Sequence, residues 1–166
     1  MVLVTMLFGC NKLKHIPFEY SYHTSVNVPA APVVGATVTV PLTVKTNIDS
    51  VMEANHTKPD LLQSAKLKTL TLSITAPPGQ TFEVLKGISV YVVTDQGDML
   101  IAQKQNISSS ASSLDMDVEN VELKPYLVAE NMNLKATVTT ANGMTREMTL
   151  YFDMRVHFEA NLLAAF

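Results

Sequence analysis

The chain has 166 residues, which suits a single domain with a core large enough to fold without disulfides. Its formal net charge is only -3 and no stripe of Lys and Arg appears, so the sequence lacks the electrostatic signature of nucleic-acid binding. Charged residues make up 16% of the chain, below the roughly 25% of an average domain. Thr, Ser, Val and Asn take their place, and the β-branched residues among them favour sheets.

The chain begins with a short apolar run, Val2 to Phe8, which leads to the only cysteine, Cys10. The sequence Leu7-Phe8-Gly9-Cys10 resembles the lipobox of a bacterial lipoprotein, in which a small residue precedes the cysteine. Phe8 is bulkier than the residue that most lipoboxes have at its position. The resemblance implies that residues 1–9 are the remnant of a signal peptide. It also implies that Cys10 is the first mature residue and carries a lipid on its sulfur.

Residues 10–14 would then form a lipidated N-terminus and a polar tether. The implied partner is the membrane, reached through the lipid on Cys10, and two or three acyl chains make such an attachment lasting. An acidic cluster after the cysteine directs some Gram-negative lipoproteins to the cell surface, and residues 11–14 contain no acid. We therefore expect an outer-membrane protein on the periplasmic side. The alternative is that Val2 to Phe8 is an ordinary strand and Cys10 a buried thiol.

After the tether the chain is a succession of short strands separated by turn residues. Phe18 to Val28 alternates apolar with polar residues, the period-2 pattern of a half-buried strand. Thr37 to Lys45 repeats the pattern, and Pro41 within it predicts an edge strand or a bulge. Residues 48–63 predict a loop with one or two helical turns. Lys68 to Ile74 predicts a third strand, which ends before the prolines at 77 and 78.

The middle of the chain has the same succession of short strands and turns. The predicted elements are a helical turn at Thr81 to Lys86, a hairpin of Ile88 to Thr94 with Met99 to Gln103, a short strand at Leu114 to Val118, and a strand at Leu134 to Thr140. A Ser-rich loop precedes the third of these, and residues 124–126 interrupt the chain before the last.

The final strand allows a sharper prediction. Even-numbered residues from Met148 to Phe158 form an apolar face opposite a polar face of odd-numbered ones. If this strand pairs with Leu134 to Thr140, a two-residue turn at Asn142-Gly143 would put the two apolar sets on opposite faces of the hairpin. We therefore predict a three-residue turn, residues 141–143, with Gly143 in the left-handed conformation and a G1 bulge.

Seven or eight short strands with one or two helical turns, and no βαβ alternation, predict an all-β fold. We expect an antiparallel two-sheet sandwich, immunoglobulin-like in general shape, over residues 15–166. A closed up-and-down barrel is the alternative. No internal repeat divides the chain, so one folded domain is expected after the tether.

Residues with catalytic or metal-binding potential are scattered. The four histidines, His15, His23, His56 and His157, lack the spacing of metal ligands, and neither a metal nor another cofactor is predicted. His23 and His157 fall on the polar faces of their strands, where histidines are usually solvated. The serines lie outside any Gly-x-Ser-x-Gly elbow, and no Gly-rich phosphate loop occurs. No catalytic residue is therefore predicted.

Two pairs of aspartates resemble ligand or catalytic pairs but favour simpler interpretations. Asp95 and Asp98 lack the ligand spacing of a Ca²⁺ loop and predict a hairpin turn. Asp115 and Asp117 project from one face of a short strand, where most carboxylate pairs are solvated.

Three tripeptides match glycosylation acceptors, and one group of aromatic residues could contact a glycan. The tripeptides are Asn55-His56-Thr57, Asn106-Ile107-Ser108 and, for O-glycosylation, Asp49-Ser50-Val51, which favours an exposed loop at that position. The aromatic residues Phe18, Tyr20 and Tyr22 share one strand face, which usually belongs to a core.

Together these observations favour a lipid-anchored envelope protein that acts as a non-catalytic binding or structural module, with an envelope protein or a glycan as its partner. One alternative is a pilus-like assembly subunit that uses strand exchange through the long C-terminal strand and its apolar tail, Asn161 to Phe166. The other is a glycan-active enzyme whose two carboxylates, distant in sequence, lie roughly 5 to 9 Å apart.

Overall fold

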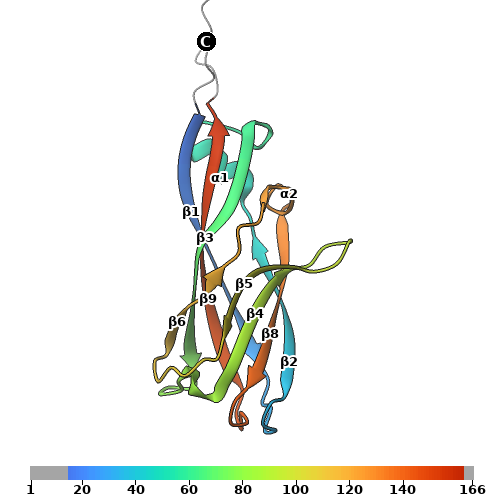
Figure 1. The fold of residues 1–166 in the computed structure, drawn as a ribbon. Helices are drawn as coiled ribbons and strands as arrows, with labels where there is room; N and C mark the ends of the chain where they lie inside the picture. Colours follow the sequence, from blue (N-terminus) through green and yellow to red (C-terminus); the bar gives the residue numbers. More distant parts are fainter. Residues whose placement is uncertain (1–14, 163–166) are drawn as a thin grey trace, which may run out of the picture.

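The computed structural model describes residues 15–162, which form nine strands in two antiparallel sheets. The predicted two-sheet sandwich is confirmed (Figure 1). The strands are β1 (His15–Val28), β2 (Thr37–Lys45), β3 (Leu62–Ala76), β4 (Leu85–Val92), β5 (Met99–Gln105), β6 (Ser113–Asp115), β7 (Asp117–Val118), β8 (Asn131–Thr140) and β9 (Met148–Asn161). The short helices are α1 (Ile48–Ala54), η1 (Pro59–Leu61), η2 (Phe82–Val84) and α2 (Lys124–Leu127).

The order of the strands is that of a double-sheet jelly roll. The four-stranded sheet has the order β1-β9-β3-β6, and the five-stranded sheet has the order β2-β8-β4-β5-β7. Such a fold pairs the first strand with the last, and consecutive strands mostly lie in opposite sheets. An immunoglobulin sandwich distributes its strands differently. Strand number and alternation indicate a sandwich but do not reveal which strands are paired.

Strand β9 supplies the centre of the core. Its even-numbered residues from Met148 to Phe158 are all buried, as the period-2 pattern predicted, and Phe152 and Phe158 are fully buried. β1 runs beside it through fourteen uninterrupted register pairs, from His15↔Asn161 to Val28↔Met148. The Phe18 and Phe158 rings stack with centroids 5.1 Å apart. Burial of these side chains on the inner face stabilises the sandwich by roughly 1.5 to 3 kcal/mol for each large residue.

Strand β3 is longer than predicted and contains bulges. The sequence pattern indicated only Lys68 to Ile74, but β3 begins at Leu62. Its buried residues include Leu67 and then Leu70, which differ in parity, so a regular strand would turn one of them outward. A register shift between Leu67 and Thr69 absorbs the difference, because Lys68 is an extra residue opposite β9.

The predicted hairpin of the last two strands is wrong. β8 pairs with β2 and β4 in the five-stranded sheet, whereas β9 pairs with β1 and β3 in the other sheet. The connection between them therefore crosses from one sheet to the other. The argument for a G1 bulge assumed direct pairing and fails with it, although Gly143 does adopt a positive φ of 70°. The prediction followed from proximity in sequence, which does not hold for these two strands in a jelly roll.

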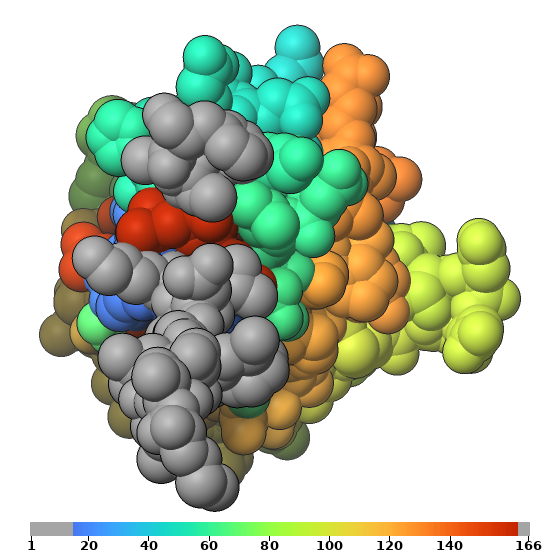
Figure 2. Space-filling model, turned by 90° about the horizontal axis from the view of Figure 1, so that it is seen from above, coloured from blue at the N-terminus to red at the C-terminus, as the bar shows by residue number. Residues whose placement is uncertain are grey.

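The segment predicted as one strand at Leu114 to Val118 is shared between the two sheets. β6 pairs with β3, and β7 pairs with β5, while Met116 between them is buried. Two further predictions are confirmed. Pro41 lies on an edge strand, and β4 and β5 form a hairpin whose turn projects from the body of the molecule (Figure 2).

The predicted signal peptide, Cys10 and the tether to Lys14 lie outside the described residues. Within residues 15–162, no helix has the length and apolar character that crossing a membrane requires.

Gly143 provides a test of the connection between the sheets. A Cβ at this position would lie 2.3 Å from the Pro32 carbonyl oxygen, whereas a Cβ at Gly35, which has nearly the same φ of 73°, would meet nothing within 4 Å. We expect Gly35→Ala to lower the free energy of unfolding by about 1 kcal/mol, the cost of the left-handed conformation. Gly143→Ala should cost about 2 kcal/mol more, because of the clash. Urea denaturation measures both, and equal losses would contradict the close approach to Pro32.

Tyr22 provides a second test. Its side chain is only 3% exposed, and its hydroxyl is buried without a hydrogen-bond partner among residues 15–162. Removing a buried hydroxyl that has no partner removes its desolvation cost, so Tyr22→Phe should raise the free energy of unfolding by about 1 kcal/mol. Tyr20→Phe is the matched control, because Tyr20 is 37% exposed and its change should stay within about 0.5 kcal/mol. A loss of stability in Tyr22→Phe would mean that the hydroxyl has a partner.

Candidate functional site

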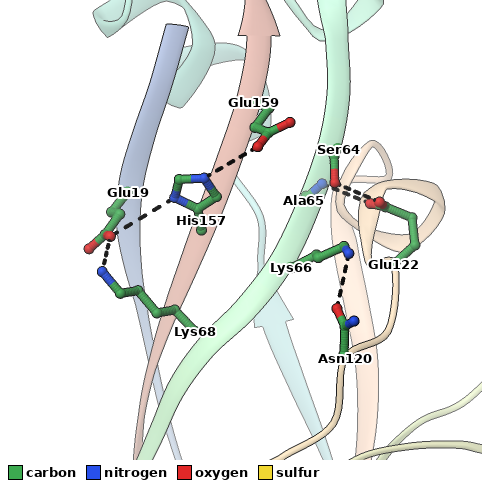
Figure 3. Close-up of polar contacts among 9 residues, drawn as sticks. All are labelled: Glu19, Ser64, Ala65, Lys66, Lys68, Asn120, Glu122, His157 and Glu159. Atoms are coloured by element: carbon green, nitrogen blue, oxygen red, sulfur yellow. Dashed lines mark hydrogen bonds and ion pairs between the residues drawn. The ribbon is translucent and has the colours of Figure 1, made fainter.

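A cluster of ion pairs lies on the outer face of the four-stranded sheet, where β1, β9 and β3 run side by side (Figure 3). Glu19 of β1 accepts a hydrogen bond from Lys68 Nζ of β3. His157 of β9 lies between these strands, with Nδ1 4.0 Å from Glu19 Oε1 and Nε2 3.7 Å from Glu159 Oε1. Arg155 Nε lies 3.9 Å from Glu19 Oε2. Three strands that are distant in sequence therefore supply one charged surface.

The electrostatics of this cluster centre on Glu19. The hydrogen bond from Lys68 is the main cause that holds the pKa of Glu19 below its ordinary value, against a smaller effect of burial, and the charges of Lys68, Arg155 and His157 add to the lowering. Glu19 is thus ionised at neutral pH and balances the charge of Lys68. These pairs are solvent-exposed, so their contribution to stability is small.

A second set of contacts holds residues 119–124 against the edge of β3. Glu122 accepts hydrogen bonds from Ser64 Oγ at 2.7 Å and from the Ala65 N–H at 2.7 Å (Figure 3). It also accepts one from the Lys124 N–H at 3.0 Å. Burial alone would raise the pKa of Glu122, but these hydrogen bonds outweigh it and hold the pKa below its ordinary value. Leu123, fully buried beside it, anchors the segment in the core.

The edge of β3 is open between two such attachments. The Met116 N–H donates to the Leu70 carbonyl at 2.9 Å, and the Leu123 N–H donates to the Ala65 carbonyl at 2.7 Å. Within residues 15–162, no backbone hydrogen bond joins the intervening segment to the edge from Lys66 to Thr69. The chain leaves the four-stranded sheet here to form β7 in the other sheet, and a gap remains.

This gap is a cleft of about 430 Å³. Its lining residues are Glu19, Lys66, Leu67, Lys68, Val118, Glu119, Asn120 and His157. Lys66 reaches across the cleft from β3, and its Nζ donates to Asn120 Oδ1 at 2.9 Å (Figure 3). Leu67 and Val118 come from opposite sheets; Leu67 is only 5% exposed and Val118 is half-buried, so the apolar surface at the floor of the cleft is narrow. The cleft thus combines apolar contacts with donors and acceptors.

A second hollow adjoins the cleft and shares Lys68 with it. It has a volume of about 310 Å³, and Thr71, Asp115, Asp153 and Arg155 are among its lining residues. Asp115 accepts a hydrogen bond from Thr71 Oγ1 at 2.7 Å. The charged surface therefore continues along β3 and β9 beyond the cleft.

The structure separates most of the residues singled out in the sequence. His23 stacks on Tyr151 and lies 3.4 Å from Asp153, while His157 belongs to the cluster described above. His15 and His56 are exposed elsewhere. In the part of the chain that the structure describes, no group of three or more His, Cys, Asp or Glu side chains is arranged to hold a metal ion.

The aspartate pairs have separate partners. Asp95 lies in the expected turn, and Asp98, which follows that turn, pairs with Lys135. Asp115 and Asp117 lie in different sheets, because the chain crosses between them at Met116. Asp117 pairs with Lys104 at 3.0 Å. The prediction that the two carboxylates share one strand face is therefore wrong.

The glycosylation and glycan-contact hypotheses find little geometric support. Asn55 donates its side-chain amide to the Val51 carbonyl at 2.8 Å, and Thr57 of the same tripeptide is buried. Residues 49–51 lie in α1 rather than in a loop. Of the three aromatic residues on β1, Phe18 stacks in the core and Tyr22 is buried, so they form no exposed platform. Asn106 is exposed at a positive φ of 54°.

Sequence reasoning missed the cleft and its ion pairs. A usable signal was present in β3, where the apolar residues Ala65 and Leu67 are odd-numbered and Leu70 and Leu72 are even-numbered. That switch of parity predicts a bulge between them. The contribution of residues 118–120, which come from a different part of the chain, had no local signal.

In comparisons of sequence, no family model and no curated protein matches the chain. Among solved structures, Desmodium yellow mottle tymovirus is similar at 15% identity over 99% of this chain and 97% of that chain, with a TM-score of 0.29. The acidic stable capsid of Helicobacter pylori bacteriophage KHP30 is similar at 12% identity over 91% and 100%, with a TM-score of 0.40. GH31 CBM32-2 bound to GalNAc is similar at 10% identity over 71% and 66%, with a TM-score of 0.32. Likenesses this weak carry no argument about function.

The attachment of residues 119–124 can be tested through Glu122. Glu122→Gln should lower the free energy of unfolding at pH 7 by about 1 kcal/mol, a modest value because the side chain is exposed. The folded-state pKa lies below the ordinary value of 4.5. The stabilisation is therefore present above that value and is lost as the pH falls through the lowered folded-state pKa.

The difference between wild type and Glu122→Gln, measured by urea denaturation, should thus be constant above about pH 6 and should shrink toward about pH 3. Glu53→Gln, a change of an exposed glutamate in α1, serves as the control and should show no such trend. A Glu122→Gln difference that is independent of pH would contradict the role of the carboxylate.

Proposed function

We propose that this protein is a lipid-anchored component of the bacterial envelope, held to the membrane through Cys10, and that it acts as a non-catalytic binding module. The anchor rests on the resemblance of Leu7-Phe8-Gly9-Cys10 to a lipobox. The absence of an acidic residue in positions 11–14 favours the periplasmic side of the outer membrane. The binding role rests on the cleft at the open edge of β3.

The geometry of the fold is compatible with an anchor at this position. His15 and Asn161 are register partners, so β1 begins and β9 ends at the same pole of the sandwich (Figure 1). Cys10 is five residues before His15, a separation that spans at most about 18 Å of extended chain. Because β-strands rise about 3.3 Å per residue, Glu19 lies about 13 Å along β1 from His15. The cleft is therefore on the half of the domain nearest the proposed anchor.

The carboxylates with a lowered pKa at the cleft suit binding better than glycoside hydrolysis. A hydrolase needs a carboxylic acid whose pKa is raised so that it can protonate the leaving group. Glu19, in the cleft, and Glu122, beside it, both have their pKa lowered by hydrogen bonds and positive charge. Carboxylates of this kind accept hydrogen bonds from a ligand, which is the role we assign to Glu19.

The anchor is tested by expression in a Gram-negative host. The mature protein should begin at Cys10, carry the mass of a lipid, and partition into the detergent phase. Cys10→Ala should be unmodified and should partition into the aqueous phase, because a single apolar segment without a lipid gives no lasting attachment. Intact-mass spectrometry and detergent partitioning measure both. A wild-type chain that retains residues 1–9 and carries no lipid would refute the anchor.

A further inference from the structure

We propose that the cleft at the open edge of β3 binds an uncharged acetamido sugar unit of an envelope glycan. The inference rests on the proposed function only for the source of the glycan. Binding of the sugar by the cleft depends on residues 66–68 and 118–120 and does not require the lipid anchor. The argument has three steps: charge balance, the arrangement of donors and acceptors, and the apolar floor.

The charges that line the cleft cancel. Its two carboxylates are Glu19 and Glu119, and its two ammonium groups are Lys66 and Lys68. The formal charge of these four groups is therefore zero. An anionic ligand such as a phosphate would require an excess of cations, as in Arg-rich or Lys-rich sites. A balanced set of charges favours a ligand that carries no net charge.

The donors and acceptors suit a ligand that offers both. Lys66 has a neutral partner, Asn120, so its ammonium group can donate to a ligand carbonyl without breaking an ion pair. Glu119 accepts a hydrogen bond from Gln103 at 3.3 Å and keeps further acceptor capacity for a ligand N–H or O–H. Asn120 presents both an acceptor and a donor at the rim. Sugar hydroxyls both donate and accept, so a mixed lining of this kind satisfies them.

The floor of the cleft selects within the neutral sugars. Leu67, which is only 5% exposed, and the half-buried Val118 form a narrow apolar floor between the two sheets, and Lys66 and Asn120 line the same cleft. An acetamido group matches this lining, because its methyl can make the apolar contact, its carbonyl can accept a hydrogen bond and its N–H can donate one. The volume of about 430 Å³ lies within the range of roughly 300 to 1,000 Å³ typical of ligand sites. A sugar that lacks the acetamido group leaves the floor uncovered.

The test uses the full chain in detergent micelles and two neutral β1,4-linked disaccharides as probes. N,N′-diacetylchitobiose carries acetamido groups, and cellobiose has hydroxyls in their place. In saturation-transfer NMR, the acetamido methyl of diacetylchitobiose should receive the strongest saturation. Its Kd should be at least about fivefold lower than that of cellobiose, the effect of about one lost hydrogen bond together with apolar contact. Glucuronic acid, an anionic probe, should bind more weakly than diacetylchitobiose.

Two variants locate the binding in the cleft. Lys66→Met keeps the aliphatic length of the side chain but removes its donor, and Asn120→Ala removes the rim amide. Each should weaken binding of diacetylchitobiose at least about fivefold. Lys45→Met, a change of an exposed lysine at the end of β2, is the matched control and should leave the Kd unchanged. Because the two site variants change different segments, misfolding of one leaves the other as the test.

Each outcome bears on the proposal. Preference for diacetylchitobiose that both site variants weaken supports it. No saturation transfer from wild type, equal binding of cellobiose, stronger binding of glucuronic acid, or unchanged affinity in a folded site variant would overturn it. The result is separable from the anchor: if the chain carries no lipid but binds diacetylchitobiose in this way, the sugar site stands and the proposed membrane attachment does not.

Discussion

The fold depends on the position of β9 between β1 and β3. This strand, the last in the described chain, pairs over its full length with the first and over twelve register positions with the third. Its inward side chains, among them Phe152 and Phe158, are at most 1% exposed. Because β1 and β9 are far apart in sequence, their pairing closes a long loop, which costs entropy and is slow to form. The segment up to Asn161 already pairs within the sheet, so strand exchange would require those pairs to be broken.

The cleft follows from how β3 joins this sheet. β3 must keep Leu67 and Leu70 inward on either side of Lys68, and the bulge that allows this also places Lys68 on the outer face beside Glu19. On the opposite edge, the chain that would extend β6 leaves for the other sheet at Met116 and returns to β3 only at Leu123. The same two features that satisfy the core therefore leave polar groups exposed beside a narrow apolar seam between the sheets. Bulges are often found next to functional sites for this reason.

Local patterns predicted the elements of this fold well, and pairing much less well. The alternation in β1, β2 and β9 identified their buried faces because a half-buried strand repeats every two residues. Pro41 marked an edge strand because proline has no N–H to donate. The predicted pairing of β8 with β9 was wrong because alternation identifies the two faces of a strand but not the strands beside it. In the site, only the bulge in β3 had a local signal in the sequence. Asn120 and Glu119 reach the cleft because the chain changes sheet, and the neighbouring residues do not indicate that change.

The position of the cleft limits where its ligand can be if Cys10 holds the lipid. The chain from Cys10 to His15 and the strand from His15 to Glu19 together span at most about 31 Å, the sum of about 18 Å of tether and about 13 Å of strand. The opposite pole lies farther away, because β1 continues for nine more residues to Val28, about 30 Å beyond Glu19. The loops at that pole, including the exposed Val33 and Val34, would thus face more distant partners. With a lipid on Cys10, a ligand for the cleft would have to come within about 31 Å of the bilayer surface, and the length of the tether would decide which part of the envelope the cleft can reach.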